Sequence, residues 1–65
     1  MLPKEITWLG EVAADAARRA IPNVEQNRGQ FVSKVVNALT AIPENLRGEE
    51  TKYFLEKYKN GAYNY

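Results

Sequence analysis

The sequence predicts an all-α fold, a compact three-helix domain with helices at about residues 3–20, 27–41 and 48–59, and one domain over the whole chain, 1–65. In each of the three segments, apolar side chains recur at the helical period. Residues that start or stop helices stand between the segments. No segment alternates apolar and polar residues over more than a few positions, as a half-buried strand would, so we expect no sheet.

The first helix is the segment 3–20, which consists mostly of good helix formers. Pro3 suits the first helical position, and Asp15 lies one turn before both Arg18 and Arg19, so that it can pair with either. Seven apolar residues share one face at 100° per residue: Leu2, Ile6, Leu9, Ala13, Ala16, Ala17 and Ala20. We expect this face to be buried and its alanines to allow close helix packing, so that Ala16→Leu costs about 1–3 kcal/mol by overpacking.

The second helix is expected to begin at Asn27, because Asn27 and Gln30 have the spacing of a capping box. Its predicted buried stripe consists of Phe31, Val35, Ala38, Leu39 and Ile42, widened by Val32 and Val36. The valines are weak helix formers, so tertiary packing has to hold this segment helical.

The third helix is expected to end at Asn60–Gly61, since glycine is the usual left-handed cap. An extra helical turn over 43–46 is expected to precede it, because Pro43 is tolerated only in a first turn. Its predicted buried face consists of Thr51, Phe54, Leu55 and Tyr58, and its exposed face includes Glu49, Glu56 and Lys57.

The chain contains no cysteine and no histidine. A disulfide is therefore excluded, and a metal site would lack its usual ligands. Small domains have a thin margin of stability and often add a staple of one of these kinds. We therefore expect a partner subunit to supply the missing stability, most simply in a symmetric homodimer.

The location predicted from the sequence is the cytoplasm, because the absence of cysteine fits a reducing compartment. No apolar run approaches the roughly 18 residues of a membrane-spanning helix, and the N-terminus lacks the layout of a signal peptide. The net charge of +1 argues against a uniformly basic surface but permits a local basic patch.

We expect no enzymatic activity and no cofactor, because the commonest general base and the thiol nucleophile are both absent. The carboxylate pairs Glu11 with Asp15 and Glu49 with Glu50 are interpreted as solvated helix faces. Ser33 has no candidate base beside it. No glycine-rich phosphate loop and no calcium-binding loop occurs, so neither a nucleotide nor a metal site is predicted.

The predicted partner-binding residues are Trp8, Arg18, Arg19 and Tyr53. Trp8 and Tyr53 lie off the apolar faces of their helices by the period count and have charged neighbours, as anchor residues of interfaces do. If the two helices lie side by side, both rings could join one patch. The alternative is that each ring closes the core as a lid.

The leading functional hypothesis is a small helical protein-binding module, such as a modulator, inhibitor or accessory subunit of bacterial or phage type. The alternative is a small DNA-binding regulator of helix-turn-helix character, for which seven basic residues are candidates: Arg18, Arg19, Arg28, Lys34, Lys52, Lys57 and Lys59. Acidic residues share the third helix, which disfavours nucleic acid as the partner. A third hypothesis is a structural subunit of a homo-oligomer.

Overall fold

The structure of the protein is a computed structural model that describes residues 2–58. Helix α1 spans Pro3–Ala20, α2 spans Arg28–Thr40 and α3 spans Glu49–Tyr58, and single 3-10 turns lie at Ile21–Asn23 (η1) and Glu44–Leu46 (η2). The predicted all-α fold of three helices is confirmed, and the described residues contain no strand. The turn η2 follows Pro43, as expected, whereas η1 was not predicted.

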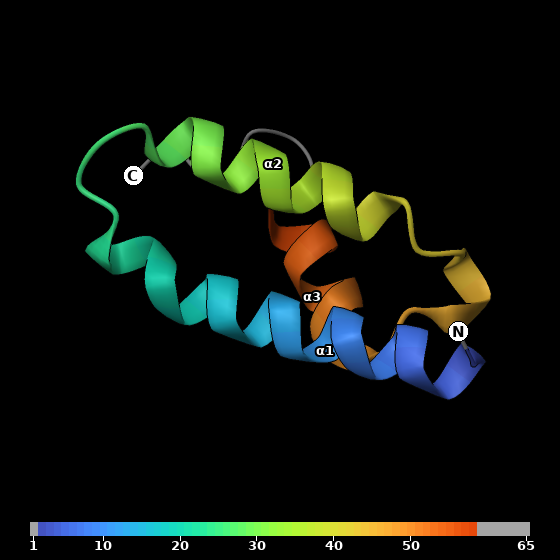
Figure 1. Ribbon diagram of the computed structural model, residues 1–65. Coiled ribbons are helices and arrows are strands. Elements are labelled where there is room, and N and C mark those ends of the chain that lie inside the picture. The colour runs from blue at the N-terminus through green and yellow to red at the C-terminus, as the bar shows by residue number, and fades with distance from the viewer. Residues whose placement is uncertain (1, 59–65) are drawn as a thin grey trace.

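Helices α1 and α2 run side by side in opposite directions, and α3 crosses between them and contacts both (Figure 1). The connection of residues 21–27 joins α1 to α2 at one end of the pair, and η2 leads from the other end of α2 into α3 (Figure 1). Among residues 2–58, no helix is long and apolar enough to cross a membrane.

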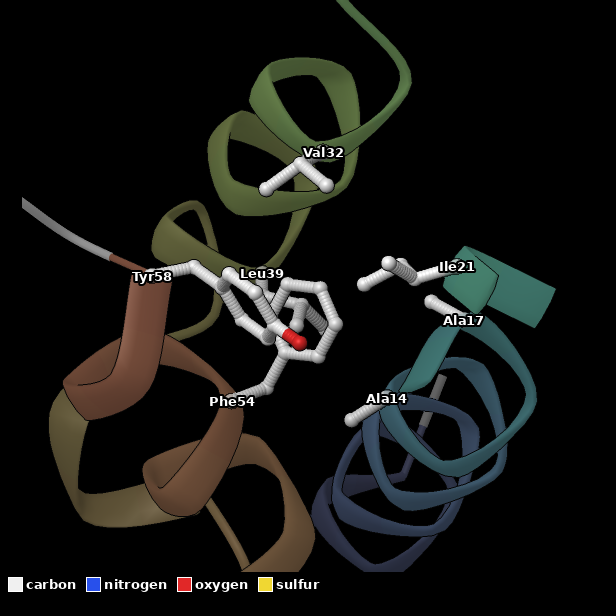
Figure 2. Close-up of a cluster of buried hydrophobic side chains, with 7 residues drawn as sticks. All are labelled: Ala14, Ala17, Ile21, Val32, Leu39, Phe54 and Tyr58. Atoms are coloured by element: carbon white, nitrogen blue, oxygen red, sulfur yellow. The ribbon is translucent and has the colours of Figure 1, made fainter. Parts of the chain in front are cut away.

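The core lies where the three helices meet (Figure 2). Its buried apolar side chains come from every helix and from η1: Ala14, Ala17, Ile21, Val32, Leu39, Phe54 and Tyr58. The rings of Phe54 and Tyr58 lie 4.6 Å apart between their centroids and are tilted by 41°. Aromatic pairs in this geometry add to the free energy gained by burial. Phe54 and Tyr58 belong to the predicted buried face of α3, which is confirmed with Thr51.

The buried face of α1 differs from the predicted one. Gly10, Ala14 and Ala17 are buried, whereas Ala13 and Ala16 are exposed. A Cβ atom on Gly10 would lie 2.6 Å from Ile42 Cδ1 and 3.0 Å from Thr51 Oγ1. The absence of a side chain at Gly10 therefore allows α3 and the end of the α2 segment to approach α1 closely. The expected close packing through Ala13 and Ala16 is wrong.

Helix α2 also departs from expectation at its start. It begins at Arg28, and Asn27 stands before it in the left-handed conformation, with φ of 58° and no side-chain hydrogen bond to the helix. A capping box needs an extended N-cap residue, so the predicted box with Gln30 does not form. The buried stripe is centred on Val32 and Leu39, and Ala38 is exposed.

The start of α3 is stabilised by a carboxylate from another helix. Gly48 precedes α3 and has no side chain with which to cap it. Glu11 of α1 takes this role: its Oε2 accepts a hydrogen bond from the Thr51 backbone N–H at 2.9 Å and another from the Thr51 hydroxyl at 3.3 Å. The interpretation of Glu11 as a solvated residue is therefore wrong. The predicted end of this helix, at residues 59–61, lies outside the described residues.

Candidate partner-binding site

A pocket of about 520 Å³ opens at the surface where the end of α1 faces the end of α3. Its lining combines cations, tyrosines and apolar residues: Arg18, Ile21, Pro22, Arg28, Tyr53, Lys57 and Tyr58. These residues come from all three helices and from η1, so the pocket exists only in the assembled fold. We refer to this set of residues as the Tyr53 pocket.

Two cations lie close to the ring of Tyr53. Its centroid is 5.8 Å from the guanidinium carbon of Arg18 and 5.7 Å from Nζ of Lys57. Lys57 follows Tyr53 by one helical turn, which places both side chains on the same side of α3. The same Nζ lies 5.6 Å from the ring centroid of Tyr58. Cation–π attraction at these distances stabilises the arrangement by about 0.5–1 kcal/mol per pair where the site is exposed.

The surrounding contacts hold Arg18 in place. Its Nη2 lies 3.1 Å from Asp15 Oδ1, and its Nε lies 3.4 Å from Glu50 Oε1. These two carboxylates belong to α1 and α3, so Arg18 links the two helices as well as contacting the Tyr53 ring. The side chains of Arg18, Asp15 and Glu50 are all partly exposed. Ion pairs in such positions stabilise a fold only modestly.

The other two cations have different surroundings. Arg28 donates from Nε to the backbone oxygen of Val24 at 3.0 Å, which positions its side chain at the start of α2. Within the described residues, Lys57 forms no ion pair, and its ammonium group lies near the two tyrosine rings. Among residues 2–58, no carboxylate therefore compensates the charge of Lys57.

The structure brings two of the four predicted binding residues together. Arg18 and Tyr53 both line the pocket, and Tyr53 is 50% exposed. Arg19 does not line the pocket; its side chain is 75% exposed, and its Nε lies 3.2 Å from Asp15 Oδ2. Asp15 thus pairs with both arginines, as the spacing predicted.

Trp8 lies apart from these residues. It is 61% exposed and lines a separate, mainly apolar hollow with Pro3, Lys4, Thr7 and Leu46. Trp8 precedes Arg18 by ten positions, which is roughly 15 Å along a helix. The expected single patch of Trp8 and Tyr53 is therefore not formed, and the exposure of Trp8 also contradicts its interpretation as a lid over the core.

Sequence reasoning did not assign Arg28, Lys57, Tyr58 or Pro22 to a protein-binding site. Lys57 had a usable signal, since it follows Tyr53 by four residues on a helix. Arg28 and Pro22 had no such signal. The path of the connection between α1 and α2 decides which side chains lie next to them, and the sequence does not show that path.

The residues that line the pocket are cations, tyrosines and apolar side chains. In residues 2–58, no group of three or more acidic, cysteine or histidine side chains is placed to hold a metal ion. The pocket offers charge, hydrogen-bond donors and aromatic faces to a ligand. No protein-family model, curated protein or solved structure matches the chain.

Proposed function

We propose that this chain is a small protein-binding module that acts by occupying a surface of its partner, as a modulator, inhibitor or accessory subunit of bacterial or phage type does. The Tyr53 pocket is its binding site. The observation that carries the proposal is the half-exposed ring of Tyr53 in contact with the charged groups of Arg18 and Lys57, in one pocket with Arg28. Tyrosine and arginine are enriched among the residues that dominate binding energy at interfaces.

The composition of the pocket indicates what the partner contributes. A carboxylate next to Lys57 would form a charge-assisted hydrogen bond with an ammonium group that no carboxylate of the described residues neutralises. An apolar or aromatic side chain would pack on Tyr53 and against Ile21 and Pro22. We therefore propose that the partner presents an acidic segment with at least one large apolar side chain.

Binding without chemistry is part of this proposal. Its basis is that the sequence has no histidine or cysteine and that the ionisable groups lining the pocket are cations and tyrosines. We propose the cytoplasm as the location, again because the sequence contains no cysteine.

An NMR titration of the isotope-labelled protein tests the proposal. The probe is a short peptide that alternates glutamate and tyrosine. We expect the backbone amide signals of Tyr53, Lys57 and Arg28 to shift on addition of the peptide. Tyr53→Ala and Lys57→Glu should each weaken binding at least tenfold, since the first removes the stacking surface and the second reverses the charge.

Trp8→Ala is the matched control, because it removes another exposed aromatic ring that lies outside the pocket. This variant should bind the peptide as the wild type does. Shifts that are spread over the whole surface, or equal losses in Trp8→Ala and Tyr53→Ala, would contradict the proposed site.

Duplex DNA is the alternative ligand, because Arg18, Arg28 and Lys57 converge on one pocket and could contact phosphates. Against it, Glu50 lies beside Arg18, and Glu49 and Glu56 are exposed on α3. A titration with mixed-sequence duplex at about 50 and 200 mM salt separates the two, since DNA affinity falls steeply with salt. Tight duplex binding at the lower salt, with no response to the peptide, would favour the DNA-binding hypothesis.

A further inference from the structure

An apolar stripe on α1 is left uncovered by the rest of the fold. Leu9 is 43% exposed, Val12 is 48% exposed, and Ala13 and Ala16 are also exposed. These residues share one side of the helix at 100° per residue. Helix α1 forms an edge of the molecule (Figure 1), and α3 packs against a different side of it, which contains Gly10 and Glu11. We call Leu9, Val12, Ala13 and Ala16 the α1 stripe.

We propose that a second copy of this chain docks on the α1 stripe, with the two α1 helices antiparallel about a two-fold axis near Val12. In such a pair each contact occurs twice, with the roles of the copies exchanged. Leu9 and Ala16 lie on opposite sides of Val12, about one turn away from it, so Leu9 of one copy faces Ala16 of the other. A large side chain then meets a small one, which lets the helices approach closely.

The charges at the two ends of the stripe select this occupant and its direction. Glu5 and Arg19 are both exposed, and each lies seven residues from Val12, on the same flank of the stripe. In an antiparallel pair centred on Val12, Glu5 of each copy therefore faces Arg19 of the other. A parallel pair would place like charges together, which is unfavourable. The Arg19 side chain is 75% exposed beside Asp15, so it can reach across to the second copy.

The surface beside the stripe also suits a helix. A shallow, mainly apolar groove runs between α1 and α2 and is lined by Ile6, Leu9, Gly10, Ala13, Ala38, Leu39 and Ile42. It continues the stripe toward α2, because Leu9 and Ala13 belong to both. A second copy would cover apolar surface that the monomer leaves exposed to water. A domain with a small core gains the most stability from such an added subunit.

This inference goes beyond the proposed function and does not depend on it, because no residue of the α1 stripe lines the Tyr53 pocket. One helix pair makes a small interface, so we expect a reversible dimer with a dissociation constant between about 10 and 500 µM, the range of a weak complex. Sedimentation equilibrium from about 10 µM to 1 mM covers this range. A wild-type protein that stays monomeric over all of it overturns the proposal.

Substitution of a residue in the α1 stripe tests whether the dimer interface lies there. Leu9→Glu places a carboxylate within the proposed contact, one turn from its centre, and should leave the protein monomeric at 1 mM. Ser33→Glu is the matched control, because Ser33 is exposed on α2 away from the stripe, and it should dimerise as the wild type does. Circular dichroism confirms that both variants fold. A Leu9→Glu variant that folds and still dimerises overturns the proposed interface.

Charge reversal tests the antiparallel pairing. Glu5→Arg and Arg19→Glu should each weaken dimerisation at least fivefold, because each places like charges together twice in the dimer. The double variant, Glu5→Arg with Arg19→Glu, restores opposite charges and should recover most of the wild-type affinity. If the double variant is as weak as the single ones, the antiparallel pairing is overturned. Peptide binding at the Tyr53 pocket should persist in Glu5→Arg, because Glu5 does not line that pocket.

Discussion

Glu11 shows how much one side chain can matter in a fold of this size. The first N–H groups of a helix have no partner within the helix, and Gly48 offers no side chain at the start of α3. The carboxylate of Glu11 accepts from the N–H and the hydroxyl of Thr51. A Cβ atom on Gly48 would lie 2.6 Å from Glu11 Oε1, so the glycine also makes room for the carboxylate. One residue of α1 thereby ties the start of α3 to α1.

Glu11→Ala should lower the free energy of unfolding by about 1–2 kcal/mol, the cost of losing a helix cap. Urea unfolding followed by circular dichroism measures it. Glu25→Ala is the matched control, since Glu25 is an exposed carboxylate in the connection before α2, and it should stay within about 0.5 kcal/mol of the wild type. Equal stabilities of the two variants would show that the Glu11 contact contributes nothing.

Trp8 is the residue whose two interpretations differ most in their energetic consequence. With 61% of its surface exposed, Trp8→Ala should cost less than about 1 kcal/mol of stability, whereas truncation of a buried tryptophan costs about 3–5 kcal/mol. Thermal melts of the variant distinguish these values. A loss of 3 kcal/mol or more would show that the Trp8 side chain is packed against the core.

Among the elements, α1 has the most ambiguous face. Its apolar residues extend over more than half of its circumference, from Val12 through Leu9 and Ala13 to Ala14. Two neighbouring helices cover only part of that surface, and the part that they cover contains Gly10, Ala14 and Ala17. Only small residues of α1 are therefore buried in the monomer, and the larger Leu9 and Val12 are left outside.

A matched pair of substitutions tests which face of α1 is packed. Ala14→Leu should cost about 1–3 kcal/mol by overpacking, because Ala14 is only 1% exposed. Ala16→Leu should be neutral within about 0.5 kcal/mol, because Ala16 is exposed. This value replaces the loss expected from the sequence. Both are measured by denaturant unfolding at low micromolar concentration, and the reverse order of stabilities would contradict the packing described here.

On the scale of the whole molecule, stability depends on one aromatic junction. Phe54 is fully buried where side chains from α1, η1 and α2 converge (Figure 2). Phe54→Ala should cost about 3–5 kcal/mol, which approaches the total stability of a domain of this length, about 3–10 kcal/mol. We expect this variant to be largely unfolded by circular dichroism at 25 °C. A cooperative melt close to that of the wild type would show that the core lies elsewhere.

The sequence by itself determined where the helices lie along the chain. It also determined the buried face of a helix wherever only one face was apolar. Proline, glycine and the apolar period placed α1 at its observed bounds, α2 within one residue at each end, and the start of α3 within one residue. Thr51, Phe54 and Tyr58 form a narrow stripe on a short helix with charged residues opposite, so the period left no choice of buried face for α3.

Tertiary structure decided everything that depends on where one helix lies relative to another. The period shows which residues share a side of α1, but not which sector of a wide apolar surface α2 and α3 will cover. It likewise cannot show that Glu11 meets Thr51 forty residues away, or that Tyr53 meets Arg18 while Trp8 does not. These contacts follow from the crossing of α3 over the α1–α2 pair, and that crossing is set by the side chains of all three helices together.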